Sequence, residues 1–122
     1  MTLRLRHPSS LVDLAECCGS GSPFRWAAVR GQAERGLSWS LLDEAGTALA
    51  AGGVLPGGGC WFVAAPAVGR HMLEMVRIAG RVLDTIPGPL AVDVRTEAGA
   101  RIARLCGFRP CARGPWQRFS DG

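Results

Sequence analysis

The chain has 122 residues, 48% of them hydrophobic, and a formal net charge of +4. That length supports one domain with a single core, spanning residues 1–122, and excludes two. The sequence has no apolar run as long as a membrane span and no basic leader before an apolar stretch, so we expect neither a membrane segment nor export.

The charged residues and the cysteines narrow the classes of function. All 14 basic residues are arginine, and they are spread from Arg4 to Arg118 with acidic residues between them, which argues against a nucleic-acid interface. The 5 cysteines include no CxxC pair, and His7 and His71 lie outside any metal-type cluster. We therefore expect reduced thiols, a cytoplasmic location and no metal site.

The first part of the chain predicts one strand and two helices. Residues 2–6 alternate apolar and basic side chains, which is typical of a half-buried edge strand. Ser9 or Ser10 can cap a helix that ends at Gly19. After a glycine- and serine-rich loop, a second helix is expected over residues 23–36, because proline suits its first turn.

The middle of the chain predicts three antiparallel strands. Residues 39–43 and 47–55 read as a hairpin around the turn at 44–46, and residues 60–64 read as a third, strongly apolar strand. The glycines at 52–53, inside the second of these strands, indicate either a β-bulge or a close approach of another group to the backbone.

The remaining elements alternate between helix and strand. We expect the longest helix to start at residue 67 or 68 and to run to residue 84, because its apolar and charged residues separate onto opposite faces. The elements after it are a strand over 90–94, a helix capped by Thr96 that ends at Gly107, and two short strands, one from Phe108 onward and one over 116–120. No repeat or linker interrupts this order, which predicts one mixed α+β domain.

The segment over 96–108, TEAGARIARLCGF, carries a resemblance to a known family. A helix that ends in Gly-Phe after a strand resembles the second signature of the GCN5-related N-acetyltransferase (GNAT) superfamily. Gly107 can adopt the left-handed conformation after the helix, and Phe108 can then point into the core. The resemblance covers roughly the last two thirds of the chain and implies a central, mostly antiparallel sheet with helices on both faces.

The same resemblance implies acetyl-CoA as the cofactor. In the family the fourth and fifth strands splay apart, the pantetheine arm lies between them, and backbone N–H groups at the start of the next helix bind the pyrophosphate. The phosphate loop is degenerate here, because residues 65–71 contain one glycine and a proline. Arg70 is either a phosphate ligand or a surface residue paired with Glu74. The implied cofactor site consists of Phe62, Val63, Ala64, Val68, Gly69, Arg70 and Thr96.

Catalytic candidates must replace the family's usual groups. The position of the usual tyrosine acid is Ala103, the chain has no tyrosine, and residues 60–63 contain no carboxylate that could act as the base. Asp93, His71 and Cys106 are the substitutes. Asp93 is either the base or a solvent-facing residue that points away from its valine neighbours. His71 either takes or gives a proton or is a surface residue at the start of the helix. Cys106 is either an acid or nucleophile near the acyl group or a small core residue.

Two functions follow from the resemblance. One is transfer of an acetyl group from acetyl-CoA to an amine. The alternative is a catalytically inactive GNAT fold that serves as a structural or interaction protein of a phage or phage-derived particle, because short, degenerate relatives occur among phage proteins, including internal virion proteins. Exposed Trp26, Trp39 or Trp116 side chains would favour this alternative, with a virion protein as the partner.

Overall fold

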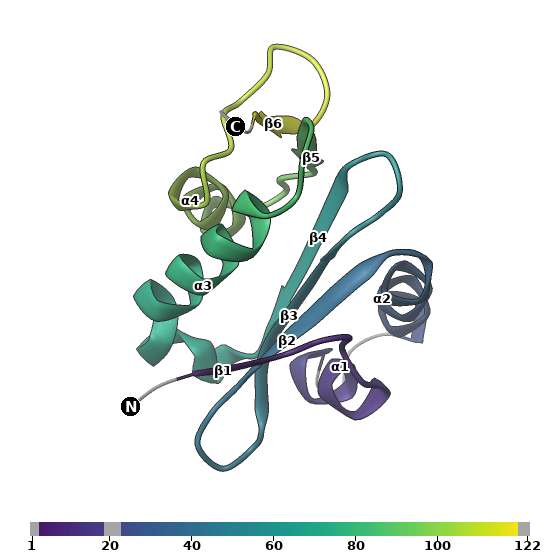
Figure 1. The fold of residues 1–122 in the computed structure, drawn as a ribbon, viewed down its shortest axis with the longest axis vertical. Helices are drawn as coiled ribbons and strands as arrows, with labels where there is room; N and C mark the ends of the chain where they lie inside the picture. Colours follow the sequence, from purple (N-terminus) through teal and green to yellow (C-terminus); the bar gives the residue numbers. More distant parts are fainter. Residues whose placement is uncertain (1–2, 19–22, 120–122) are drawn as a thin grey trace.

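The computed structural model describes residues 3–18 and 23–119, which form a single six-stranded sheet. The strand order in the sheet is the order in the chain, and all neighbouring strands are antiparallel except the parallel pair β4 and β5 (Figure 1). The predicted fold class, α+β with a mostly antiparallel sheet, is therefore confirmed. The strands are β1 (Arg4–Arg6), β2 (Leu37–Leu42), β3 (Ala48–Val54), β4 (Gly59–Ala64), β5 (Leu90–Val92) and β6 (Trp116–Arg118).

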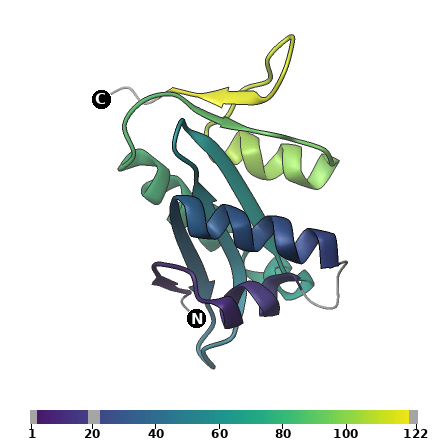
Figure 2. The ribbon, with the colours of Figure 1, turned by 90° about the vertical axis from the view of Figure 1, so that its right-hand side faces the viewer.

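Helices cover both faces of the sheet, as the resemblance implied (Figures 1 and 2). Each face has its own apolar core. Met75 and Phe108 belong to the core under α3 and α4, whereas Leu14 and Val29 belong to the core under α1 and α2. The helices are α1 (Leu11–Cys18), α2 (Pro23–Arg35), α3 (Met72–Asp84) and α4 (Glu97–Leu105), and a 3₁₀ helix, η1 (Pro66–His71), precedes α3.

Gly52 and Gly53 allow two tryptophan rings to approach β3 closely, one on each face of the sheet. A Cβ atom on Gly52 would lie 2.9 Å from the Trp39 ring, and one on Gly53 would lie 2.5 Å from Nε1 of Trp61. The register of β3 with β4 is continuous through both glycines, and the irregularity in this part of the sheet lies between Leu41 and Leu42 of β2. Close approach, rather than a bulge, therefore explains the glycine pair.

The structure corrects two of the predicted elements. The expected helix over 67–84 is two elements, because Pro66 starts a 3₁₀ turn and the backbone of His71 (φ −114°, ψ 16°) leaves the helical region before α3 begins. Phe108 starts no strand, since only Arg109 forms an isolated β-bridge, with Gln117. The other bounds shift by a few residues, and Thr2, Gly19 and Ser120 lie outside the described residues.

Both ends of α4 form as predicted. The hydroxyl of Thr96 accepts a hydrogen bond of 2.9 Å from the N–H of Gly99, which caps the helix. Gly107 has φ +96°, a conformation that side chains disfavour, and Phe108 beyond it is 3% exposed in the core. The predicted Gly-Phe closure is therefore confirmed.

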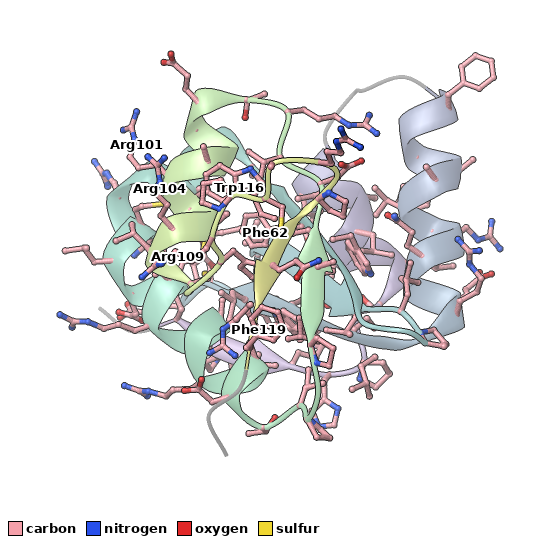
Figure 3. All side chains as sticks on the ribbon, turned by 90° about the horizontal axis from the view of Figure 1, so that it is seen from above. Phe62, Arg101, Arg104, Arg109, Trp116 and Phe119 are labelled. Carbon is pink, nitrogen blue, oxygen red and sulfur yellow. The ribbon has the colours of Figure 1, made fainter. Side chains whose placement is uncertain are left out.

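The helix α4 and the strand β6 contact each other through side chains near the C-terminus. The guanidinium of Arg104 in α4 lies 5.3 Å from the centre of the Trp116 ring in β6, which is a cation–π contact. Figure 3 shows that Arg101, Arg104 and Arg109 project on the same side of the molecule as α4, and all three are exposed. These arginines do not line the cavity described below.

Candidate functional site

The sheet opens between β4 and β5. The two strands pair only where Gly59 faces Ala91 and Cys60 faces Val92. Beyond this point β4 continues to Ala64, whereas β5 has ended, so the strands diverge toward η1. The splayed strands that the resemblance implied are therefore present.

Backbone groups of β4 face this opening. The carbonyl of Gly59 accepts a 2.7 Å hydrogen bond from Leu55, and the N–H of Ala65 donates a 2.8 Å bond to Leu49, so these two residues direct their polar groups toward β3. Successive residues of a strand direct their backbone N–H and C=O groups to opposite sides, so Phe62 and Ala64 direct these groups toward β5. No β5 residue is in register with them, so these backbone groups are available to a ligand.

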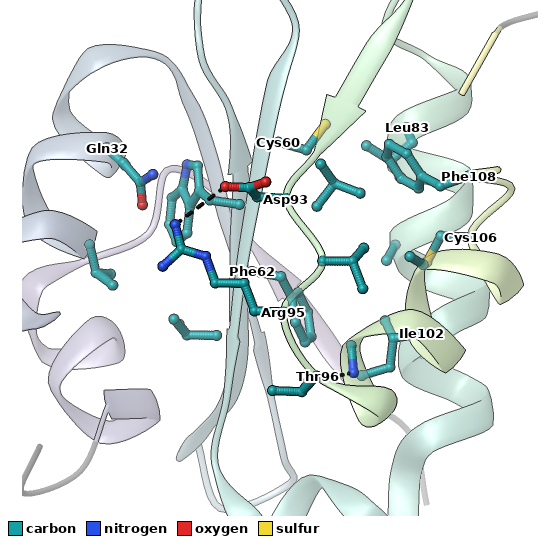
Figure 4. Close-up of a pocket in the computed structure, with 18 of the residues that line it drawn as sticks. Gln32, Cys60, Phe62, Leu83, Asp93, Arg95, Thr96, Ile102, Cys106 and Phe108 are labelled. Carbon is teal, nitrogen blue, oxygen red and sulfur yellow. Dashed lines mark hydrogen bonds and ion pairs between the residues drawn. The ribbon is translucent and has the colours of Figure 1, made fainter. Parts of the chain in front are cut away.

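A cavity of about 500 Å³ occupies the opening. Side chains from α2 line it on one face of the sheet, and side chains from α3 and α4 line it on the other, so the cavity crosses the sheet (Figure 4). Most of the lining is apolar. The side chains that bring polar atoms or a thiol to it are Gln32, Trp39, Cys60, Trp61, Asp93, Arg95, Thr96 and Cys106.

The charged groups lie on the α2 side of the sheet. Asp93 points opposite to Val92 and Val94, which pack against the core under α3 and α4, so the predicted alternation is confirmed. Its carboxylate accepts a hydrogen bond from Nη2 of Arg95 at 3.3 Å. The two side chains are 70% and 83% exposed, so Asp93 both faces solvent and borders the cavity. Figure 4 shows Gln32, Asp93 and Arg95 on the same side of the strands.

Thiols lie on the opposite side. Burial raises the pKa of Cys60 to about 11, and burial likewise raises the pKa of Cys106, in both cases against the opposing effect of the Arg118 guanidinium. Cys106 is 7% exposed and belongs to the core under α3 and α4. At neutral pH both side chains are therefore protonated thiols, which can donate a proton but are weak nucleophiles.

The degenerate phosphate loop forms a second hollow. Gly69, Arg70 and His71 line it together with the first turns of α3, and β4 leads directly into this segment. Within the described part of the chain the ion pairs do not include Arg70, and the Glu74 carboxylate accepts a hydrogen bond from the N–H of Leu3. The expected alternative pairing of Arg70 with Glu74 is thus absent among these residues.

The structure thus divides the predicted site residues into groups. Phe62, Val63, Asp93, Thr96 and Cys106 line the cavity, whereas Gly69, Arg70 and His71 line the hollow. Ala64 and Val68 line neither, because both side chains pack with the core under α3 and α4, so only their backbone could reach a ligand.

The sequence analysis did not identify Gln32, Trp39, Trp61 and Arg95 as cavity residues. Among the buried side-chain nitrogen and oxygen atoms of the described residues, only Nε1 of Trp39 and Nε1 of Trp61 have no hydrogen-bond partner. An unpaired buried donor costs about 1–3 kcal/mol. The glycines of β3 were the available signal, since they mark the place where both rings cross the strand.

Comparison with solved structures supports the fold, whereas the comparisons based on sequence find no relative. No family model matches the sequence, and a search of curated proteins finds no match. Among solved structures, a crystal structure of a GNAT superfamily phosphinothricin acetyltransferase from Sinorhizobium meliloti, in complex with acetyl-CoA, superposes with a TM-score of 0.57. The match covers 100% of this chain and 91% of that one, at 14% identity. The chain has the GNAT fold.

Ala103 of α4, which the resemblance aligned with the family's tyrosine, is 6% exposed and lines the cavity. Among the described residues no group of His, Cys, Asp or Glu could hold a metal ion. The described helices include none that is long and apolar enough to cross a membrane.

Proposed function

We propose that the chain transfers an acetyl group from acetyl-CoA to a primary amine. The observation that carries the proposal is the cavity through the β4–β5 opening, which reaches both faces of the sheet. An acyl donor on the α3 and α4 side and an amine on the α2 side could meet within it. The crystal structure with the same fold, which holds acetyl-CoA, supports this choice of donor.

The residues present fit the pantetheine arm of acetyl-CoA. Phe62, Val94 and Ile102 supply apolar walls. The backbone groups of Phe62 and Ala64 that face the β4–β5 opening supply hydrogen bonds for the amides of the pantetheine arm and for the thioester carbonyl. Pro66 lacks an N–H, so η1 offers fewer backbone donors to a pyrophosphate. Arg70, exposed beside Gly69, would replace part of that contact with a charged hydrogen bond.

When bound, acetyl-CoA supplies a thioester carbonyl that an amine attacks, so that a C–N bond forms, the C–S bond breaks and CoA leaves as its thiol. Asp93 lies on the amine side and would accept the proton that the amine loses. Cys106, a protonated thiol on the other side, would donate the proton that the leaving sulfur needs. His71 lies in the hollow beside Arg70, a place suited to phosphate contact.

Calorimetric titration with acetyl-CoA and CoA tests the proposal. We expect binding with a Kd in the micromolar range, weakened about 10-fold in Arg70→Ala through the loss of one charged hydrogen bond. Arg113→Ala, another exposed arginine outside both the cavity and the hollow, is the matched control and should bind as the wild type does. No heat up to millimolar ligand would overturn the proposal.

The alternative, an inactive particle protein, stays a prediction. Exposed tryptophan side chains would have favoured this alternative. Trp39 is only 5% exposed, and Trp26 and Trp116 are half-buried, so these three residues do not form an exposed patch. The match of this whole chain to 91% of an acetyltransferase of the same fold supports the enzyme function instead.

A further inference from the structure

The α2 side of the cavity combines apolar walls with a pair of opposite charges. Ala28 and Val29 of α2 and Val63 of β4 form the apolar part, and Asp93 and Arg95 border it. Figure 4 shows that Phe62 and Ile102, the walls suited to the acyl donor, lie on the opposite side of the strands. A ligand on the α2 side therefore meets a surface of different chemistry from that met by the donor.

Asp93 and Arg95 are well placed to bind a ligand that carries both charges. The side chains lie two positions apart just after the end of β5, Figure 4 shows them on the same side of the strands, and their charged atoms are 3.3 Å apart. Because both side chains are mostly exposed, their ion pair is weak and a ligand can separate them at little cost in free energy. An ammonium group can replace Arg95 at the carboxylate while a ligand carboxylate takes the guanidinium in a bidentate contact.

The charge of Arg95 selects against other amines. A purely cationic amine at Asp93 would lie beside the unneutralised guanidinium, which repels it. A carboxylate attached near the amine removes this repulsion. It also brings acceptor atoms to the face of the sheet where the buried Nε1 of Trp61 has no partner and where the amide of Gln32 projects.

We infer that the acceptor is a free α-amino acid with an apolar side chain, held through its ammonium group by Asp93 and through its carboxylate by Arg95. The inference rests on the proposed function and specifies its substrate. The apolar side chain lies against Ala28, Val29 and Val63, walls that offer no partner to a charged or strongly polar group.

The test compares L-methionine with L-methioninamide, which share the amine and the apolar side chain but differ in the carboxylate. In an assay of CoA release from acetyl-CoA, we expect kcat/KM for methionine to exceed that for the amide about 10-fold or more. Arg95→Gln should lower the value for methionine about 10- to 100-fold and raise the value for the amide, because it removes the guanidinium that repels a cationic amine. Arg113→Gln, exposed and outside the cavity, is the matched control and should change neither.

A second measurement separates this inference from the proposed function. In ¹H–¹⁵N NMR spectra of the protein without acetyl-CoA, methionine should shift the indole N–H signal of Trp61 in the wild type and not in Arg95→Gln. If acetyl-CoA binds and the amide is acetylated as fast as methionine, the amino-acid inference is overturned and the acetyltransferase remains. If acetyl-CoA does not bind but methionine gives the Arg95-dependent shift, the proposed function fails and the amino-acid site stands. No shift at millimolar methionine overturns the site.

Discussion

The strands β2 to β4 and the strands β5 and β6 are held together in different ways. The first group shares long registers, and tryptophan rings cover its central strand on both faces. The second group is joined to the rest of the sheet by a short register at Gly59 and Cys60 and by the hydrogen bond of 2.9 Å from the N–H of Ala91 to the carbonyl of Gly58. The Arg118 side chain of β6 donates hydrogen bonds to the carbonyl of Cys106, just after α4, and to the carboxylate of Asp84 in α3. The cavity therefore results from where strand pairing stops, since β4 continues past the last residue of β5.

The largest effect is expected in the first group, from Gly53→Ala. The added Cβ would lie 2.4 Å from the carbonyl oxygen of Leu37 and 2.5 Å from Nε1 of Trp61, so backbone and ring must both move. We expect the free energy of unfolding in urea to fall by about 3 kcal/mol. Gly80→Ala in α3 is the matched control, because nothing lies within 4 Å of its Cβ position, and it should gain about 0.5–1 kcal/mol. Similar values for the two variants would refute the close-packed description of β3.

A smaller effect is expected in the second group, from Arg118→Ala. The guanidinium donates a 2.8 Å hydrogen bond to the carbonyl of Cys106 and also pairs with Asp84, and the side chain is only 11% exposed. Its removal should lower the free energy of unfolding by about 1–2 kcal/mol. Arg101→Ala removes an exposed arginine of α4 and should change it by less than about 0.5 kcal/mol. If both variants matched the wild type, the contacts of Arg118 would not contribute to stability.

Thiol labelling probes the joint between the two groups without altering the fold. Burial raises the pKa of Cys60 from 9.0 to about 11, so below pH 9 its thiolate fraction is about 100-fold lower than that of an ordinary thiol. Peptide mapping after iodoacetamide treatment should show Cys60 labelled far more slowly than exposed Cys111 at pH 8. The rate at Cys60 should rise about 10-fold per pH unit up to pH 11. Equal labelling at pH 8 would show that this joint opens readily to solvent.

The same pKa shift affects stability in a defined direction. The folded state favours the protonated thiol of Cys60, so the stabilising contribution is complete below pH 9 and is lost as the pH rises toward about 11. The free energy of unfolding should therefore fall over this window, and Cys60→Ala should reduce the fall. A decline of the same size in the variant would assign it to other groups.

Local chemistry made most of the elements predictable. The cap at Thr96 and the left-handed Gly107 depend on hydrogen bonds and backbone conformation within a few residues, and both are present. The alternation that places Asp93 opposite its valine neighbours is also local. The start of the long helix was wrong because the apolar periodicity of residues 67–84 continues through a 3₁₀ turn, which periodicity does not distinguish from a helix.

The sequence was enough to predict the mixed α+β class, most of the element order and both ends of α4, because these follow from periodicity, turn residues and caps within short stretches of chain. Only the tertiary structure decided which residues share the cavity. Gln32 and Arg95 are far apart in the chain and line the same cavity because α2 and the segment after β5 border the same opening. Likewise, the unpaired N–H groups of Trp39 and Trp61 depend on how the rings lie against glycines of another strand. Contacts between distant segments depend on the packing of the whole sheet, which no local pattern encodes.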